Sequence, residues 1–324
     1  MNQVKTIGVL TSGGDAPGMN AAVRAVVRTA VEFDIRVLGI RRGYNGLMTG
    51  DIVELDKRSV SDIIQKGGTI LYTARCLEFK EEAGVRQAAA VARDFGIDGL
   101  VVIGGDGSFR GARDLSGMGI PTVGIPGTID NDIVCTDYTI GFDTASNIAM
   151  EAVDRLRDTA QSHERCTVVE VMGARAGHLA LDVGVATGAI AVVVPEKEYD
   201  LEGDICGKIL EGQKTGKHHH IVIVAEGYPG GGKIVADTIG RVTGIETRLT
   251  VLGHIQRGGS PTVMDRVNAT RMGYRAVDLL RKGIGNRVVA IKSNDVVDFD
   301  ITEALAMKKD INHGLCDICR IVSK

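Results

Sequence analysis

The segment TVGIPGTIDND, residues 122–132, passes from an apolar run directly into a turn that carries one threonine and two aspartates. We expect Pro126 and Gly127 to end the run, because both residue types interrupt regular structure. Polar side chains in a loop directly after a buried strand are frequently functional. The alternative is an Asx-rich turn whose aspartates accept hydrogen bonds from backbone amides, and residues 126–132 alone leave both interpretations open.

Similar apolar runs recur along the chain and alternate with longer amphipathic segments. They are rich in β-branched residues and cover residues 6–10, 36–40, 99–105, 122–126, 167–172, 190–195, 221–227 and 288–292. Because they are continuous rather than alternating in polarity, they suit strands that are covered on both faces. Segment 144–160 has apolar residues at 145, 148, 149, 152, 153 and 156, the spacing of one helix face. The alternation predicts an α/β protein with mostly parallel sheets.

The composition argues against several classes of protein. The 324 residues suffice for one large domain or two ordinary ones, and 44% are hydrophobic, so we expect a packed core. A net charge of −3 disfavours duplex nucleic-acid binding, and an aromatic content of 4% disfavours stacking of single-stranded bases. No apolar run has membrane-spanning length, and the N-terminus lacks a signal-peptide layout. We therefore expect a cytoplasmic protein with no membrane or nucleic-acid partner.

The cysteines are too sparse for a disulfide framework in a chain of this length. They are Cys76, Cys135, Cys166, Cys206, Cys316 and Cys319. We expect free thiols. Cys316 and Cys319 form a single CxxC pair, and without a second pair the spacing does not favour a zinc site.

Polar, glycine-containing turns follow the apolar runs. They are TSGGDAPG (11–18), GGDGS (104–108), PGTIDND (126–132), MGARAG (172–177) and AEG (225–227). In open α/β sheets, ligands bind beyond the carboxyl ends of the strands. We therefore expect these turns to open on one edge of a sheet, or on two facing edges.

The first two turns have the chemistry of phosphate-binding loops. Gly13 and Gly14 allow close approach of the backbone to a phosphate, and the next helix, with Pro17 in its first turn, offers free amides. A tight strand-to-helix turn is the alternative. In GGDGS, Ser108 can donate a hydroxyl, whereas Asp106 would repel phosphate oxygens unless a cation lay between them. Mg²⁺ is the expected cation.

Residues 126–132 also fit phosphoryl transfer. Transfer to an alcohol requires removal of the hydroxyl proton and stabilisation of the moving charge. Asp130 and Asp132 can divide these tasks, one as base and one facing a metal ion, while Thr128 can donate to the transferred group. The spacing does not say which aspartate takes which task.

Cationic side chains in other polar turns indicate a phosphorylated acceptor, because an arginine binds phosphate through two hydrogen bonds. Singly, each is more typical of a surface or structural residue. The set consists of Arg75, Arg165, Arg248, His254 and Arg257. Glu226 is suited to accept hydrogen bonds from sugar hydroxyls.

The motifs TSGGDAPGMN, GGDGS, PGTIDND, MGxxxG, AEG and LGHIQRGGSP, in this order, resemble those of the bacterial ATP-dependent 6-phosphofructokinase family. The resemblance covers nearly the whole chain and is weakest at its C-terminal end. It implies transfer of the ATP γ-phosphoryl group to the 1-hydroxyl of fructose 6-phosphate. It also implies a homotetramer whose active sites are completed across a subunit interface.

The same resemblance implies two Rossmann-like three-layer domains. The larger, ATP-binding domain would combine residues 1–140 with roughly 255–305, and the smaller, fructose 6-phosphate-binding domain would combine 141–254 with roughly 306–324.

Matched motif by motif, the resemblance gives the candidate residues roles. Asp130 resembles the general base, Thr128 a partner of the transferred phosphoryl group, and Arg75 the arginine between the two substrates. Asp106 and Asp132 resemble carboxylates linked to Mg²⁺. The positions that match ATP contacts are Gly14, Arg75, Cys76, Gly105, Asp106, Gly107 and Ser108. Those that match fructose 6-phosphate contacts are Thr128, Ile129, Asp130, Met172, Gly173, Ala174, Glu226, His254 and Arg257, with Arg165 and Arg248 reaching the 6-phosphate from a neighbouring subunit.

Three positions bear on the reaction, and one of them departs from the family pattern. Relatives that use pyrophosphate tend to carry aspartate and lysine where this chain has Gly107 and Gly127. A carboxylate at position 107 would crowd and repel an α-phosphate, so ATP is favoured. Ala174 replaces the usual arginine near the transferred phosphate, and Arg175 lies one step along. We therefore expect reduced turnover or altered substrate affinity.

Further departures concern an effector, which the family binds between subunits as ADP or phosphoenolpyruvate. The matching positions are Arg24, Arg28, Arg157, Lys217 and His219. The departures are Lys57 for arginine, Ile190 for a metal-facing glutamate, and Thr215 and His218 for lysines. We expect weak or changed allostery, and surface or interface roles for residues 218–220 rather than a metal patch.

Three alternatives stay open. The first is a kinase that uses pyrophosphate or another sugar phosphate, such as tagatose 6-phosphate. The second is a catalytically impaired paralogue that senses nucleotide and sugar phosphate, which Ala174 alone supports. The third is a lipid or NAD kinase with a GGDG turn, which leaves residues 126–132 and 254–259 unexplained.

Overall fold

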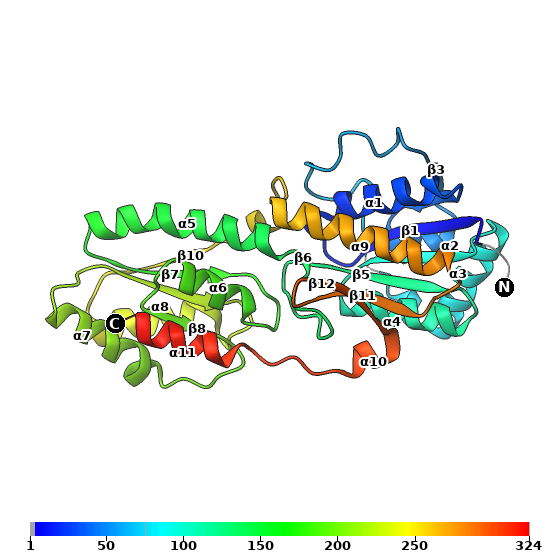
Figure 1. Cartoon of the computed structure of the whole chain (residues 1–324). Coiled ribbons are helices and arrows are strands. Elements are labelled where there is room, and N and C mark those ends of the chain that lie inside the picture. Colours follow the sequence, from blue (N-terminus) through cyan, green and yellow to red (C-terminus); the bar gives the residue numbers. More distant parts are fainter. Residues whose placement is uncertain (1–3, 75, 324) are drawn as a thin grey trace. The chain divides into compact units, whose positions relative to one another are not determined.

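Parallel strands connected by helices make up both units of the computed structural model, which describes residues 4–74 and 76–323 (Figure 1). The first unit takes in the described part of Met1–Ile129, with Ile133–Thr144 and Arg257–Lys309. The second takes in Asp130–Asp132, Ala145–Gln256 and the described part of Asp310–Lys324. Each unit is therefore assembled from segments that are distant in sequence. The predicted α/β class with mostly parallel sheets is confirmed.

The first unit contains an eight-stranded sheet of order β12-β11-β5-β4-β1-β2-β3, with β6 beside β5. Its strands are β1 (Thr6–Ser12), β2 (Arg36–Ile40), β3 (Ile52–Leu55), β4 (Gly99–Gly104), β5 (Thr122–Thr128), β6 (Ile140–Gly141), β11 (Arg287–Lys292) and β12 (Asp295–Asp300). All pairs are parallel except the two at the edges, β2 with β3 and β11 with β12.

Helices cover both faces of this sheet. They are α1 (Met19–Glu32), α2 (Gly43–Thr49), α3 (Glu82–Asp94), α4 (Asp106–Gly117), α9 (Val263–Arg281) and α10 (Ile301–Ala306), with the short 3-10 helix η1 (Glu78–Lys80). Figure 1 shows α1 beside α9 on one face. The two helices touch closely, because a Cβ at Gly273 would lie 2.6 Å from the Ala25 Cβ. On the other face, α2, α3, α4 and α10 bury one apolar core against the sheet.

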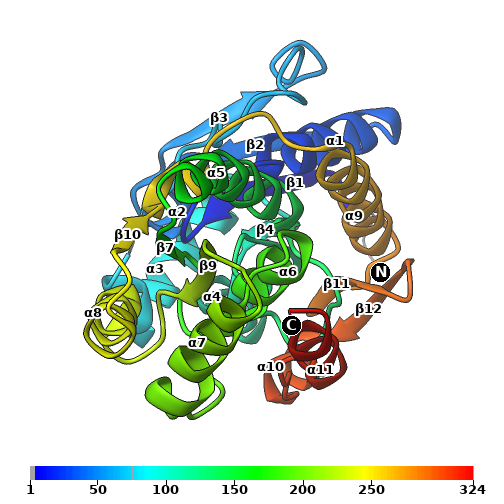
Figure 2. The ribbon, with the colours of Figure 1, turned by 90° about the vertical axis from the view of Figure 1, so that its left-hand side faces the viewer.

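The second unit has a four-stranded, fully parallel sheet of order β10-β7-β9-β8. Its strands are β7 (Cys166–Val171), β8 (Ala191–Val193), β9 (His220–Ala225) and β10 (Thr247–Val251). Its helices are α6 (His178–Ala186), the π-helix η2 (Leu201–Cys206), α7 (Gly207–Lys214), α8 (Gly231–Thr243) and α11 (His313–Val322). Helix α8, η2 and α7 close one apolar core on this sheet, and Figure 2 shows α8 beside β10 and β7. Helix α5 (Phe142–Ser162) and η3 (Gly253–Arg257) span the unit boundaries.

The predicted helix over 144–160 lies within α5, and its stripe residues Ala145, Ala149 and Val153 are fully buried. The prediction that Pro126 ends its strand is wrong. Strand β5 continues to Thr128, because its last residues pair with β6 on one side, Gly127 opposite Ile140. The predicted place of Pro17 in the first helical turn is also wrong, since α1 begins at Met19 after Gly18, whose φ is 103°.

Candidate active site

Three of the predicted ligand-binding turns lie at one edge of the sheet in the first unit. Strands β1, β4 and β5 are parallel neighbours, so the turns after Ser12, Gly104 and Thr128 open at the same edge. A parallel sheet brings the carboxyl ends of its strands together there. The sequence prediction of a common edge is confirmed for these turns.

The first two turns pack directly against each other. A Cβ at Gly104 would lie 2.4 Å from the Ser12 carbonyl oxygen, so only glycine fits. The Ser108 hydroxyl donates to that carbonyl at 3.1 Å, and the Tyr44 hydroxyl donates to the Ser108 carbonyl at 2.5 Å. The hydroxyl of Ser108, expected to meet a ligand, therefore has a partner within the fold.

Two other glycines of the second turn have no packing reason to be glycine. A Cβ at Gly105 or Gly107 would meet no atom within 4 Å, and neither residue has the positive φ that favours glycine. Gly105 precedes the first residue of α4, Asp106, whose carboxylate is 42% exposed and pairs with Arg110 at 2.9 Å. Open space beside the first amides of a helix suits an anionic ligand.

Arg257 lies against the first turn. Its guanidinium donates to the Asp15 carbonyl at 3.1 Å, and a Cβ at Gly14 would lie 2.7 Å from its Nη1. Glycine at position 14 thus leaves room for this arginine. A residue expected among the sugar-phosphate contacts lies within the first unit, beside a turn expected to bind ATP.

The turn after β5 is largely buried at its start. Thr128 and Asp130 are each 9% exposed, whereas Asp132 is exposed. The Thr139 hydroxyl donates to the Thr128 carbonyl at 2.7 Å. Strand β5 therefore carries a fixed Thr128 to the edge where the other two turns open.

Two expected ATP contacts, Arg75 and Cys76, follow β3 in the sequence. Arg75 lies outside the described residues. The Cys76 thiol is half-buried, 3.6 Å from the Met48 Sδ and 3.7 Å from the Glu78 carboxylate, and burial is the main cause that raises its pKa. A raised pKa leaves a poorly reactive thiol.

The second unit has its own set of strand-end residues. Met172 follows β7, Glu226 follows β9 and His254 follows β10, and these three strands are neighbours. The Glu226 carboxylate accepts the Ala174 amide at 2.8 Å, while the buried Gln256 side chain accepts the Met172 amide at 2.9 Å. Gln256 is a support that sequence reasoning missed.

Arg165 and Arg248 lie at the opposite end of that sheet. They sit beside the paired first residues of β7 and β10, and both bind Glu246, at 2.8 Å and 2.5 Å. The hydrogen bond from Arg165, followed by that from Arg248, lowers the Glu246 pKa. Counted along β7, Arg248 and Arg165 lie five and seven residues from the level of Glu226, which is about 17 Å and about 23 Å at about 3.3 Å per residue. One chain therefore does not gather all the expected sugar-phosphate residues.

The expected effector residues fall into two groups. In the first unit, Arg24 and Arg28 line a groove of about 540 Å³ together with Arg271, Tyr274 and Arg275 of α9. Arg157, Lys217 and His219 form the second group, within the second unit. Burial, followed by the charges of Arg157 and Lys217, lowers the His219 pKa.

The positions expected to depart from the effector pattern of the family make contacts within their own unit. Lys57 pairs with Glu32 at 3.2 Å, and the Thr215 hydroxyl donates to the Gly212 carbonyl at 2.8 Å. Ile190 belongs to the apolar core of the second unit. The expected surface role is wrong for His220, which is 0% exposed at the start of β9. The six cysteines are free thiols, as expected.

Among residues 4–74 and 76–323, no helix is both long and apolar enough to cross a membrane. In the same residues, no group of three or more His, Cys, Asp or Glu side chains is arranged to hold a metal ion. A site that uses one or two carboxylates with ligand oxygens is compatible with this finding.

Comparison with known proteins places the chain. A family model described as "Phosphofructokinase" matches residues 6–280. The chain is 60% identical over 321 residues to an "ATP-dependent 6-phosphofructokinase" of Clostridium botulinum, and 57% identical over 320 residues to one of Clostridium novyi. Each alignment covers 99% of this chain and 100% of the relative.

Solved structures agree with these matches. Pichia pastoris phosphofructokinase has a TM-score of 0.90 at 39% identity, over 94% of this chain and 36% of that one. Saccharomyces cerevisiae phosphofructokinase has a TM-score of 0.87 at 35% identity, over 93% of this chain and 44% of that one. This chain thus spans less than half of the yeast chains. A pyrophosphate-dependent phosphofructokinase of Nitrosospira multiformis, 22% identical with a TM-score of 0.85 over 98% of this chain and 91% of that one, shares the fold. The chain belongs to the phosphofructokinase family.

Proposed function

We propose that the chain transfers the γ-phosphoryl group of ATP to the 1-hydroxyl of fructose 6-phosphate, giving fructose 1,6-bisphosphate and ADP. The observation that carries this proposal is the common edge where the turns after β1, β4 and β5 open. Full-length identity of 60% to a named ATP-dependent 6-phosphofructokinase supports the same reaction. The three alternatives named from the sequence lack support of this extent.

ATP binding is proposed for the first unit. No atom lies within 4 Å of a Cβ built at Gly105 or Gly107, and an open helix start of this kind suits phosphate oxygens at the first amides of α4. Because a side chain would fit at position 107, glycine there is not required by packing. Its effect is to keep a carboxylate away from the nucleotide, which favours ATP over pyrophosphate.

In the proposed reaction Asp130 takes the proton from the 1-hydroxyl, and Thr128 donates a hydrogen bond to the transferred group. The exposed carboxylates of Asp106 and Asp132 fit Mg²⁺, which normally keeps several waters and binds proteins through one or two carboxylates plus substrate phosphates. The ion would neutralise phosphate charge. Arg75 would bridge the two substrates.

Fructose 6-phosphate binding is proposed for the strand-end residues of the second unit, with Arg257. Glu226 and His254 would contact the sugar, and Arg165 and Arg248 would bind the 6-phosphate of a neighbouring copy. Their place at the far end of β7 and β10 supports a shared site. We infer a cytoplasmic homotetramer, in keeping with the glycolytic reaction.

An effector site is proposed at Arg24 and Arg28 of one copy with Arg157, Lys217 and His219 of another. Core packing of Ile190 removes a carboxylate for an effector-bound metal ion, so the response should be weak. A strongly sigmoidal fructose 6-phosphate curve that ADP relieves would contradict this.

The reaction is tested with the purified chain, Mg²⁺ and fructose 6-phosphate, supplied with ATP or pyrophosphate. We expect fructose 1,6-bisphosphate with ATP only. Asp130→Ala should lower kcat by about 10²- to 10⁴-fold, the usual contribution of a general base, while ATP still binds. Asp237→Ala, at an exposed pair with Lys233, is the control and should keep kcat. Product with pyrophosphate, or an active Asp130→Ala enzyme, would overturn the assignment.

A further inference from the structure

The chain that follows the proposed catalytic turn returns to hold the end of β5. Residues 140 and 141 form β6, which runs parallel to the last residues of β5, with Thr128 opposite Gly141. The buried Thr139 hydroxyl donates to the Thr128 carbonyl at 2.7 Å. The backbone position of Thr128 therefore depends on the position of segment 138–144.

A single carboxylate on another element holds that segment. Asp265, in the first turn of α9, is 0% exposed and accepts two hydrogen bonds on each oxygen. Its Oδ1 accepts the Tyr138 hydroxyl at 2.5 Å and the Gly141 amide at 2.6 Å. Its Oδ2 accepts the amide and the hydroxyl of Thr144, at 2.9 Å and 2.5 Å. All of these residues belong to the first unit.

The anchor on α9 is itself fixed. The Thr262 side chain caps α9 by accepting the Asp265 amide at 3.3 Å. The Thr262 amide donates to the Thr144 hydroxyl at 3.0 Å, so the two segments are joined in a closed network. A buried network whose donors and acceptors are matched in this way allows few alternative arrangements.

We propose that Asp265 is a positioning residue for phosphoryl transfer, which fixes Thr128 through segment 138–144. This inference rests on the proposed function, because it matters for catalysis only if Thr128 contacts the transferred group. Asp265 does not touch substrate in this scheme. It acts by keeping β6 and the Thr139 hydroxyl against the end of β5.

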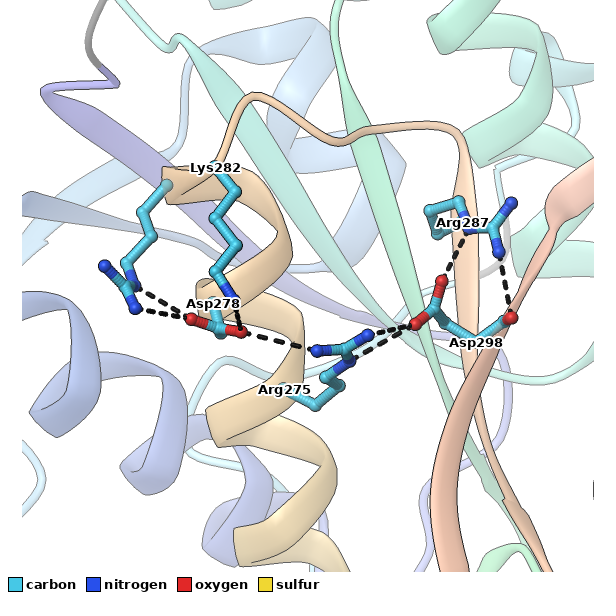
Figure 3. Close-up of polar contacts among 6 residues, drawn as sticks. Arg275, Asp278, Lys282, Arg287 and Asp298 are labelled. Atoms are coloured by element: carbon cyan, nitrogen blue, oxygen red, sulfur yellow. Dashed lines mark hydrogen bonds and ion pairs between the residues drawn. The ribbon is translucent and has the colours of Figure 1, made fainter.

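A matched buried carboxylate on the same helix provides the control. Asp278 is 7% exposed on its side chain and binds Arg275, Arg281 and Lys282, at 3.4, 2.7 and 2.7 Å (Figure 3). Arg275 also forms an ion pair with Asp298, and Asp298 forms a second ion pair with Arg287. This network joins α9 to β11 and β12 and includes no residue of segment 127–144. Asp278→Asn thus measures how far kcat falls when any buried carboxylate of α9 is weakened.

Asp265→Asn and Thr139→Val weaken the proposed support at two points. An amide at 265 keeps one acceptor but places an NH₂ group against donors, so at least one anchor of segment 138–144 is lost. Valine at 139 removes only the hydroxyl that holds the Thr128 carbonyl, and it keeps the fold testable if Asp265→Asn does not accumulate. Its matched control is Thr122→Val, at the other end of β5, where the buried hydroxyl donates to the Ala112 carbonyl at 3.0 Å.

The activity readout separates positioning from general weakening. We expect Asp265→Asn and Thr139→Val to lower kcat by about 10- to 100-fold, the scale of a small misplacement of reacting groups, with little change in the KM for ATP. Asp278→Asn and Thr122→Val should stay within about twofold of the parent enzyme. Equal kcat losses in a variant and its control would overturn the proposal.

Amide hydrogen exchange tests the same support without activity. In Asp265→Asn, exchange over residues 127–144 should accelerate by at least about tenfold, because local opening becomes easier. Asp278→Asn should leave that segment unchanged. Unchanged exchange in Asp265→Asn would refute positioning. If the parent enzyme phosphorylates no fructose 6-phosphate, the proposed function fails, and the exchange experiment still decides what Asp265 does.

Discussion

The two units use the same parallel architecture but place their candidate residues differently. The described candidates for ATP and phosphoryl transfer mostly follow three adjacent strands of the first unit at one sheet edge, although Asp130–Asp132 count with the second unit. In the second unit, Glu226 and His254 lie at the carboxyl edge, whereas Arg165 and Arg248 meet Glu246 at the amino end. The candidates that follow strands of the first unit therefore share one sheet edge, whereas those on the sheet of the second unit lie at both of its ends.

This difference indicates which part of the site depends on assembly. The chemistry of the first unit uses glycine turns, helix amides and hydroxyls that neighbouring strands hold together. The arginines of the second unit pair with a carboxylate that is 47% exposed, so binding to another copy's substrate would only need to displace a surface interaction. Surface ion pairs contribute little to stability.

The largest effect should come from combining chains that carry different defects, one at Asp130 and the other at Arg248. Arg248→Ala should raise the KM for fructose 6-phosphate by about 10- to 100-fold, because a hydrogen bond to a charged group contributes about 1.5–3 kcal/mol. Mixed with Asp130→Ala chains and reassembled, it should regain activity. Hybrid sites then combine Asp130 from one chain with Arg248 from the other. Steady-state rates at low fructose 6-phosphate measure the recovery.

Arg241→Ala is the matched control for that experiment, since Arg241 forms an exposed ion pair with Glu202 at 2.8 Å. It should leave the KM unchanged. If hybrids of the two defective chains show only the summed activity of the parent variants, each site is complete within one chain, and the comparison between the units loses its functional meaning.

The sequence predicts the buried strands well because they are continuous apolar runs. Strand β2 matches residues 36–40, and the strands expected from 6, 99 and 221 differ by at most two residues at either end. The edge strands β3, β10 and β12 were not predicted, because an edge strand need not be apolar, whereas the edge strand β8 lies within the expected run 190–195. Strand β10, TRLTV, is mostly exposed, and no apolar run is expected over its residues.

The strand-end turns were predictable as well, because the carboxyl ends of parallel strands meet at one edge whatever the connections are. The long-range hydrogen bonds that hold these turns in place were not predictable. TVMD, residues 262–265, reads as a local cap, and Thr262 does cap α9. The carboxylate of Asp265 turns instead to segment 138–144, which lies more than 120 residues away in the sequence. Such a contact is fixed by tertiary packing, and no local pattern encodes it.

The units also differ in how they bury polar side chains, and this predicts a pH dependence. Asp265 in the first unit has four donors, whereas neither ring nitrogen of the buried His220 in the second unit has a partner among the described residues. Burial, followed by the charge of Lys217, lowers the His220 pKa to about 4. The unfolded chain then binds more protons than the folded one between pH 6.5 and pH 4.

Stability should therefore fall as the pH drops through that window. Between pH 7 and pH 5, protonation linked to His220 should lower the free energy of unfolding by about 2 kcal/mol. His220→Leu removes the imidazole at similar volume, so its free energy of unfolding should change less over this range. Urea unfolding of both proteins at the two pH values measures the difference. His163→Leu, at an exposed residue, is the control. An equal pH response of parent and His220→Leu would contradict the explanation.

The smallest expected effect concerns Ala174 in the second unit, at the position where the resemblance implies an arginine. Its φ of 52° is left-handed, a conformation that costs a non-glycine residue about 1 kcal/mol. Because the side chain is exposed, Ala174→Arg should fit and raise kcat by about three- to tenfold, by adding a charged donor near the transferred phosphate. Ala174→Gly should instead raise stability by about 1 kcal/mol and leave kcat unchanged. The absence of an arginine side chain does not limit kcat if Ala174→Arg fails to raise kcat at saturating substrate. The same conclusion follows if Ala174→Gly raises kcat equally.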